Sequence, residues 1–403
     1  MEFKKYKIEE IGTVVGGGTP STKNDNYYGG NISWITPKDL SNYSNRYIYH
    51  GERNITEEGL NNSSAKLVPT DTILMTSRAP IGYLALAGKK VATNQGFKSI
   101  ICNEEIVSPK YLYYLLQNKM DNIKSLGTGS TFSEISGKVV KNIEVSLPNL
   151  LNQKRVEKVL DSIDEKIELN QKIIANLEEL SQTLFKRWFV DFEFPDENGN
   201  PYKSSGGEMI DSELGEMPLS WKVHKLNDIF KINYGKNLPT KKILNTGYPV
   251  FGGNGIIGYY SSYMYENPKI LISCRGAASG KIHISKEKSF VTNNSIVLNE
   301  KQKNYFYYFK ELFKYNDFKR YTTGSAQPQI TIANIKDLMY LTPDTNIIDQ
   351  FNSKISSLFN QKNNYEDENQ NLTQLRDTLL PKLMSGEIEI PDDIEVNEDE
   401  LSI

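Results

Sequence analysis

Residues able to support catalysis are few and scattered in this sequence of 403 residues. The glycine-rich run Phe251–Gly255 resembles a cofactor-binding loop, but no helical pattern follows it and no acidic residue lies at the required distance. The run Arg275–Lys281 has Arg where a P-loop requires its first Gly. Paired carboxylates such as Glu9 and Glu10 are typical of surface charge, and no Ser–His or Cys–His constellation is evident. The pattern favours a binding protein over an enzyme.

The composition restricts the class of protein further. Two cysteines cannot build a disulfide framework, which favours a reducing cytoplasm, and three scattered histidines argue against a zinc site. No run of apolar residues is long enough to span a membrane, and the N-terminus has no signal-peptide pattern. We therefore expect a protein with no metal site and no membrane segment.

The net charge of −3 conceals a separation of charge along the chain. Residues 215–343 contain 18 Lys and Arg against 8 Asp and Glu, and residues 1–148 contain 17 against 14. The excess of acid lies in residues 191–214 and 387–403. Basic globular blocks fit surfaces that face a polyanion, although solvated lysines alone could also explain them.

Two blocks, 1–148 and 215–343, show the same order of short strands and turns. A strand-like run precedes Ser77–Arg78, and another precedes Arg275–Gly276. A helix is predicted after Pro109 and again over Tyr305–Phe313, and a Thr-Gly-Ser turn recurs 195 positions later, at Thr323. This shared order predicts an internal duplication.

Each block is followed by a long helical pattern, over 149–190 and 344–386. Its apolar residues are spaced by alternating steps of four and three, which is typical of a coiled-coil seam. The first seam consists of Val156, Leu160, Ile163, Ile167, Ile174, Leu177, Leu184 and Trp188. The second consists of Phe351, Ile355, Leu358, Tyr365, Leu372, Leu379 and Leu383. We expect the two helices to pack antiparallel on each other.

Polar residues interrupt both seams, among them Asn170 and Asn369. They could fix the register of the pair, or they could lie at edges that face water. The apolar residues around Trp188–Phe189 exceed what two helices need, so they serve either packing against a block or docking of another protein. The Pro- and Gly-containing stretch 191–214 is predicted to be an acidic flexible linker, and the tail 387–403 to be disordered.

The whole pattern resembles the specificity subunit of type I restriction-modification systems. The matching motifs are Trp34–Leu40, Gly127–Thr131, Leu147–Pro148 followed by Gln153, Leu184–Phe189 and Leu379–Ile388. The resemblance implies an α+β fold in which two β-rich target recognition domains are separated by an antiparallel coiled coil. The second copy departs from the motif, with Ala326–Gln327 in place of Thr131–Phe132, which leaves the recognised bases open.

By this resemblance the chain would be a non-catalytic subunit that reads the two halves of a split site in double-stranded DNA. Two methyltransferase subunits would dock on the helices, and restriction subunits would join them. S-adenosylmethionine, Mg²⁺ and ATP would be bound by those partners, which would give the complex adenine-N6 methyltransferase and ATP-dependent endonuclease activity.

Within this picture, loop residues able to pair with bases or phosphates are the candidates for DNA binding. In the first block they are Arg78, Gln95, Lys98, Thr128 and Ser130, with Lys38 on phosphate. In the second block they are Arg275, Lys281, Asn293, Asn294, Ser325 and Gln327. The candidates for partner docking are Phe185, Trp188, Phe189, Leu379 and Leu383.

Two other functions remain open from the sequence. One is a methyltransferase or nuclease that is active alone, which the missing cofactor motifs disfavour. The other is a coiled-coil scaffold whose two blocks bind protein or glycan. Binding of duplex DNA would separate the scaffold from the specificity subunit.

Overall fold

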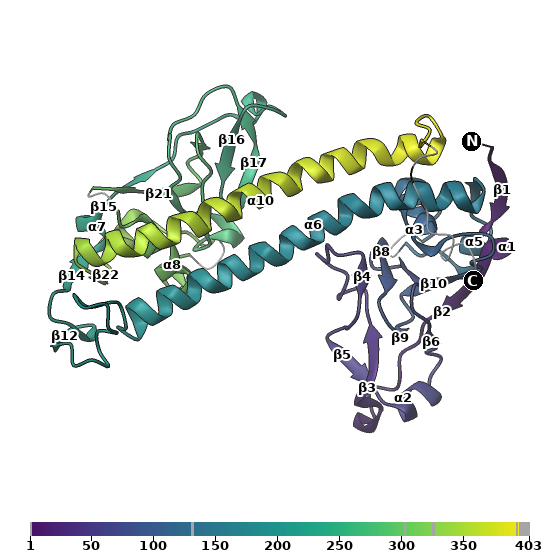
Figure 1. Cartoon of the computed structure of the whole chain (residues 1–403), viewed down its shortest axis with the longest axis horizontal. Helices are drawn as coiled ribbons and strands as arrows, with labels where there is room; N and C mark the ends of the chain where they lie inside the picture. Colours follow the sequence, from purple (N-terminus) through teal and green to yellow (C-terminus); the bar gives the residue numbers. More distant parts are fainter. Residues whose placement is uncertain (1, 130–132, 302–303, 325–326, 392–393, 395–403) are drawn as a thin grey trace. The chain divides into compact units, whose positions relative to one another are not determined.

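The computed structural model describes residues 2–129, 133–301, 304–324, 327–391 and 394. The chain forms two compact units: unit 1 comprises residues 1–171 and 367–403, and unit 2 comprises residues 172–366. The long helices α6 (Leu150–Phe185) and α10 (Thr345–Ser385), labelled in Figure 1, are each divided between the two units. Within the described part of the chain, no helix has both the length and the apolar character needed to cross a bilayer.

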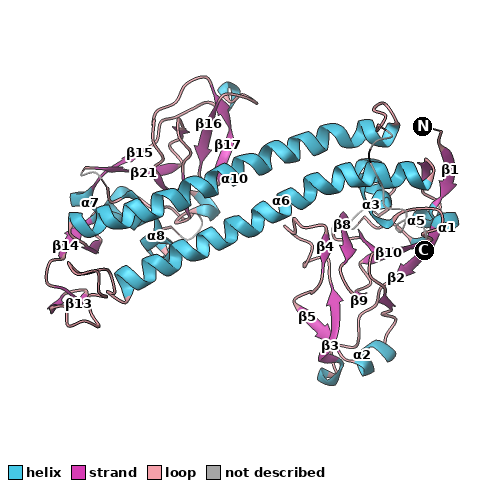
Figure 2. Ribbon diagram, viewed as in Figure 1, coloured by secondary structure: helices cyan, strands magenta, loops and turns pink. Residues whose placement is uncertain are grey.

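Unit 1 is rich in short strands, as expected (Figure 2). Its strands are β1 (Lys4–Lys7), β2 (Gly12–Gly16), β3 (Tyr28–Ile35), β4 (Tyr47–Ile48), β5 (Arg53–Ile55), β6 (Leu67–Val68), β7 (Ile73–Ser77), β8 (Ile81–Ala87), β9 (Val91–Thr93), β10 (Phe97–Cys102) and β11 (Glu144–Leu147). Its shorter helices are α1 (Ile8–Ile11), η1 (Asp25–Tyr27), α2 (Glu57–Asn61), α3 (Pro109–Asn118), α4 (Met120–Ser125) and α5 (Gly137–Lys141). The main sheets have the orders β2-β10-β7-β8-β4 and β5-β3-β9-β6, and β1 pairs with β11.

Strand β7 is central to the larger sheet and is buried along its whole length. Side chains alternate between the two faces of a strand, so Ile73 and Met75 enter one hydrophobic core and Leu74 enters another. Helix α3 covers the first of these cores with Tyr111 and neighbouring apolar residues. The end of β7 is therefore held rigidly, and Arg78 follows it directly.

Unit 2 repeats this plan. Its strands are β12 (Met209–Ser212), β13 (Gly215–Pro218), β14 (Lys222–Lys225), β15 (Phe230–Tyr234), β16 (Tyr248–Gly252), β17 (Gly255–Tyr260), β18 (Ile270–Ser273), β19 (Ile282–Ile284), β20 (Phe290–Val291), β21 (Ser295–Glu300) and β22 (Met339–Thr342). Its shorter helices are η2 (Lys186–Val190), α7 (Leu226–Ile229), η3 (Thr240–Lys242), η4 (Gly276–Ala278), α8 (Phe306–Leu312), η5 (Phe313–Tyr315), η6 (Phe318–Tyr321) and α9 (Ile332–Ile335). Sheet order β15-β21-β18-β19 matches β2-β10-β7-β8 of unit 1, and β14 pairs with β22 as β1 pairs with β11. The predicted duplication is confirmed in the topology.

The long helices pack antiparallel within each unit. In unit 1, Asp164 and Asn170 of α6 contact Arg376 and Asn369 of α10, so the partner's number falls as the residue number rises. Val156 and Leu160 of the first seam are fully buried there, and Leu383 of the second is 2% exposed. In unit 2, Glu178 pairs with Lys362 and Phe185 packs near Phe351. The predicted pairing of the two seams is confirmed within both units.

The polar interruption at Asn170 is buried in the helix pair. Its amide nitrogen donates to Asn369 Oδ1 at 2.9 Å and to Glu368 Oε2 at 2.8 Å. A buried amide that finds its partner in one alignment of the helices disfavours shifted alignments, because a shift would leave it without that partner. Of the two possibilities that the sequence left open, the geometry favours fixation of register.

The stretch 191–214, predicted to be an acidic flexible linker, contains regular structure. It forms β12, which pairs with β13, and a turn closed by pairing of Pro195 with Pro201. Phe194 is 2% exposed and stacks on Tyr202, with ring centroids 4.6 Å apart, and on Trp221 at 5.9 Å. Pro and Gly favour turns, but the burial of these aromatic rings stabilises a folded arrangement of the stretch, because each ring removes a large apolar area from water. Part of the tail is also packed, since Ile388 and Ile390 lie against the core of unit 1.

Candidate nucleic-acid interface

Three segments of unit 1 meet beside the end of β7, and we call their described residues loop cluster 1 (residues 77–78, 94–98, 128–129 and 133–134). Ser77 donates its backbone N–H to the carbonyl of Gly96 at 2.7 Å. The backbones of Thr128 and Glu134 exchange hydrogen bonds of 3.1 and 3.0 Å, and Arg78 pairs with Glu134 through a β-bridge. The structure thus brings Arg78, Gln95, Lys98 and Thr128 together, and their role in DNA binding stays a prediction. Ser130 lies outside the described residues.

Glu134 is the electrostatic centre of loop cluster 1. Its Oε2 lies 3.6 Å from Arg78 Nη1, and its Oε1 lies 3.9 Å from Lys98 Nζ. The exposed fractions of the side chains are 42% for Glu134, 36% for Arg78 and 17% for Lys98. Both cations are therefore accessible to a ligand and partly balanced by one carboxylate.

Lys38 lies in the loop that follows β3, next to loop cluster 1. The carbonyl of Ile35 accepts a hydrogen bond of 2.9 Å from the N–H of Asn94, which joins this loop to the cluster. The Lys38 ammonium donates to Glu52 Oε2 at 2.6 Å, and this hydrogen bond, with the charge of Glu52, raises the pKa of Lys38. Lys38 is 77% exposed and charged, so a phosphate could compete with Glu52 for it. Gln95 is exposed, and its side-chain oxygen accepts a hydrogen bond from the Thr19 hydroxyl.

Unit 2 builds an equivalent arrangement, loop cluster 2 (residues 274–281, 293–295, 323–324 and 327–329). The N–H of Cys274 donates to the carbonyl of Asn294 at 2.9 Å, as Ser77 does to Gly96. Thr323 and Gln329 exchange backbone hydrogen bonds of 2.8 and 2.9 Å, and Arg275 pairs with Gln329 through a β-bridge. The carbonyl of Lys281 accepts from the N–H of Ser273 at 2.9 Å. The predicted residues Arg275, Lys281, Asn293, Asn294 and Gln327 therefore lie in one cluster, and Ser325 is outside the described residues.

Sequence reasoning missed two residues of these clusters and one residue beside loop cluster 2. Glu134 and Gln329 occupy the same position of the two Thr-Gly-Ser loops, 195 residues apart, which is the offset of the loops themselves. Lys236 was also missed; it is exposed, and its carbonyl accepts from the N–H of Asn293 at 3.2 Å. Aligning the two copies position by position would have found the first two.

The aromatic candidates for partner docking lie in the core of unit 2. Phe185, Trp188 and Phe189 are 1%, 4% and 6% exposed, and all three rings lie near Phe351 of α10. Their surplus over a two-helix seam is accounted for by packing against the block, the alternative that the sequence left open. In unit 1, Leu383 is 2% exposed and Leu379 is partly buried against the same core. A direct role in docking stays a prediction for all five residues.

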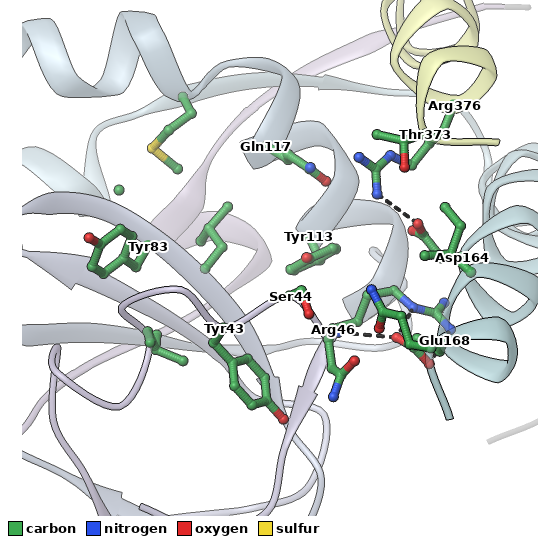
Figure 3. A pocket seen from close by; sticks show the side chains of 17 residues that line it. Tyr43, Ser44, Arg46, Tyr83, Tyr113, Gln117, Asp164, Glu168, Thr373 and Arg376 are labelled. Carbon is green, nitrogen blue, oxygen red and sulfur yellow. Dashed lines mark hydrogen bonds and ion pairs between the residues drawn. The ribbon is translucent and has the colours of Figure 1, made fainter. Parts of the chain in front are cut away.

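Within unit 1, the first block (residues 1–148) is attached to α6 through a buried ionic network that includes Arg46 (Figure 3). Arg46 is 6% exposed; its Nε donates to Glu168 Oε1 at 3.0 Å, and its Nη1 donates to Asp161. Burial lowers the pKa of Arg46, but the hydrogen bond to Glu168 and the surrounding negative charge outweigh it, so the pKa is raised. Tyr114 donates to Asp164 Oδ2 at 2.7 Å, and Asp164 also binds Arg376.

The network borders a cavity of about 410 Å³. Tyr43, Tyr83, Tyr113, Gln117 and Thr373 line it together with the charged residues (Figure 3). Burial raises the pKa of Tyr113 to about 12, so this phenol is neutral and available as a hydrogen-bond donor. The attachment of the first block to α6 therefore depends on polar side chains as well as on apolar packing.

Comparison with known proteins shows which family has these features. The model of the type I restriction modification DNA specificity domain matches residues 1–179 and 218–374. The chain belongs to the type I restriction-modification DNA specificity family. The resemblance drawn from the sequence is confirmed, and the domain occurs twice, once for each loop cluster.

Members of the specificity family resemble the chain over most of its length. The MjaIX specificity subunit of Methanocaldococcus jannaschii is 35% identical, over 95% of this chain and 93% of the relative. The HindI specificity subunit of Haemophilus influenzae is 25% identical, over 72% of this chain and 80% of the relative. A solved type I S subunit from M. genitalium has the same fold, with a TM-score of 0.65 at 19% identity, covering 95% of this chain and 96% of that one.

Proposed function

We propose that this chain is the non-catalytic subunit that gives a type I restriction-modification complex its DNA sequence specificity. Unit 1 reads one part of a bipartite site and unit 2 reads the other. The observation that supports this most is the equivalence of the two loop clusters. Each places an arginine within two residues of the end of a buried inner strand, next to amide and hydroxyl side chains that suit base edges.

The division of roles within the clusters follows from side-chain chemistry. Arginine can bond both acceptors of guanine, and Asn or Gln can bond the donor and acceptor of adenine. Lys38 and Lys281 are exposed point charges, which suit phosphates and make affinity depend on salt. The arginines and amides thus select the sequence, and the lysines hold the duplex.

Partners supply the chemistry in this proposal. Two methyltransferase subunits dock on α6 and α10, and restriction subunits join the assembly. S-adenosylmethionine, Mg²⁺ and ATP belong to those subunits. The chain acts in the cytoplasm, where chromosomal and incoming DNA are both accessible.

The substitution Arg275→Ala tests the proposal. Loss of its bonds to a base should weaken binding to the cognate site by about tenfold to a hundredfold, and binding to random DNA much less. Fluorescence anisotropy with labelled duplexes, using the chain assembled with its methyltransferase partner, measures both affinities. Mapping of methylated adenines in the host genome, with and without this gene, supplies the cognate sequence.

Lys231→Ala is the matched control, because this exposed lysine lies on β15 of the same unit, at the strand end far from Tyr234 and Lys236. It should leave the ratio of cognate to random binding unchanged. Equal losses of Arg275→Ala on both duplexes would reduce Arg275 to a phosphate contact. No preference of the wild-type assembly for any sequence would contradict the proposed function.

A further inference from the structure

The two loop clusters share a backbone but differ in charge at one central position. Glu134 pairs with Arg78 and Thr128 in unit 1, as Gln329 pairs with Arg275 and Thr323 in unit 2. The next residues, Ile135 and Ile330, are both fully buried. The backbone N–H of Ile135 donates to the carbonyl of Ser77 at 2.9 Å, and that of Ile330 donates to the carbonyl of Cys274 at 3.1 Å. The position is therefore the same in both copies, and only its side chain changes.

A second position changes with it. Lys98 of β10 lies opposite Met75 of β7, and the equivalent residue of β21, opposite Ile272 of β18, is Ile296. Ile296 is fully buried. Unit 1 thus has an arginine, a lysine and a glutamate where unit 2 has Arg275, an isoleucine and a glutamine, and no described carboxylate lies within ion-pair distance of Arg275.

The carboxylate of Glu134 keeps free hydrogen-bonding capacity. At 3.6 and 3.9 Å from Arg78 and Lys98, it makes ion pairs that are longer than hydrogen bonds. No described side chain donates a hydrogen bond to it, and 42% of its surface is exposed. A carboxylate on a surface that faces phosphates is repelled unless it accepts a hydrogen bond from the ligand.

In the major groove, the amino groups of bases are the donors that a carboxylate can accept from. A guanine–cytosine pair offers the N7 and O6 acceptors of guanine and the N4 amino group of cytosine side by side. The guanidinium of Arg78 can donate to N7 and O6 of guanine, and the carboxylate of Glu134 can accept from the N4 amino group of cytosine. The two side chains lie 3.6 Å apart, which is close enough for both to contact one base pair. We infer, on the basis of the proposed function, that Arg78 and Glu134 jointly read a guanine–cytosine pair in the half-site of unit 1.

A purely structural role for Glu134 is the alternative. In that case Glu134 only balances the charge of Lys98. Unit 2 has Ile296 in place of the lysine, so it needs no carboxylate and has Gln329 in place of the glutamate. The two roles predict different behaviour when the charges are changed singly and together.

The experiment uses the assembled complex and a library of duplexes randomised at each position of the wild-type site. Glu134→Gln should reduce the preference for guanine–cytosine at one position of the unit 1 half-site by about tenfold. It should raise affinity for all duplexes slightly, because a negative charge is lost, so the ratio between sequences is the readout. Preferences in the unit 2 half-site should not change.

The double variant Lys98→Ile with Glu134→Gln separates the roles, because it installs the pair found in unit 2 without changing net charge. Thermal unfolding of both variants verifies that they fold. If Glu134 reads a base, the double variant keeps the reduced preference for guanine–cytosine at the same position. Recovery of wild-type preference in the double variant, or an unchanged preference in Glu134→Gln, overturns the inference while leaving the proposed function intact. A wild-type complex without sequence preference would instead defeat the proposed function itself.

Discussion

Arg46→Ala is expected to lower the free energy of unfolding of unit 1 by about 3–5 kcal/mol, the range for breaking a buried ion pair from one side. The guanidinium is 7% exposed and bonds Asp161 and Glu168 of α6. Without it, two carboxylates remain close together, with Asp161 still bound by Lys110 at 2.5 Å. The first block (residues 1–148) should then be less firmly fixed to α6.

Urea unfolding followed by circular dichroism measures the total loss, and hydrogen exchange by peptide assigns it to unit 1 or unit 2. Arg53→Ala is a suitable control because Arg53 is exposed and its main described contact is the ring of Tyr28, at 4.3 Å. We expect the control to cost about 1 kcal/mol or less. Equal effects of the two substitutions would mean that the Arg46 network is not a main attachment of the block to α6.

The features that the sequence predicted are those with a regular spacing. Val156 and Leu160 belong to a seam with alternating steps of four and three, a spacing that is typical of a helix packed on another helix. Both residues are buried in the helix pair. The duplication was visible because turns such as Thr128–Gly129 recur at a fixed offset. Arg78 and Arg275 were found because each follows a strand-like run at the same place in its block.

The features that the sequence did not predict depend on contacts between distant residues. Nothing near Arg46 in the sequence indicates its partners Asp161 and Glu168, which lie more than 100 residues later. Both partners lie on a helix with many charged residues, so neither stands out in the sequence. Stretch 191–214 was interpreted from its Pro, Gly and acidic residues, while the burial of Phe194 against Trp221 depends on the fold of the whole unit. Glu134 was not singled out from the sequence, because its contacts are with two cations, Arg78 and Lys98, that are distant in sequence.

Phe351→Ala should destabilise unit 2 by about 3–5 kcal/mol, the range for deleting a buried phenylalanine ring. Phe351 is fully buried, and its ring centroid lies 4.8 Å from that of Phe189 and 5.9 Å from that of Trp188. The cavity left behind is bordered by rigid aromatic rings, which cannot easily collapse into it, so we expect the upper part of the range.

Tryptophan fluorescence during urea unfolding reports this change directly, since Trp188 and Trp221 both belong to the core around Phe351. Asn360→Ala, at an exposed position of the same helix, should change stability by less than about 0.5 kcal/mol. A loss of stability in Phe351→Ala makes Phe185, Trp188 and Phe189 structural residues whose substitution would impair partner docking indirectly. A variant as stable as the wild type, with weakened binding of the methyltransferase partner, would instead favour the direct docking role first inferred from their surplus on the helix.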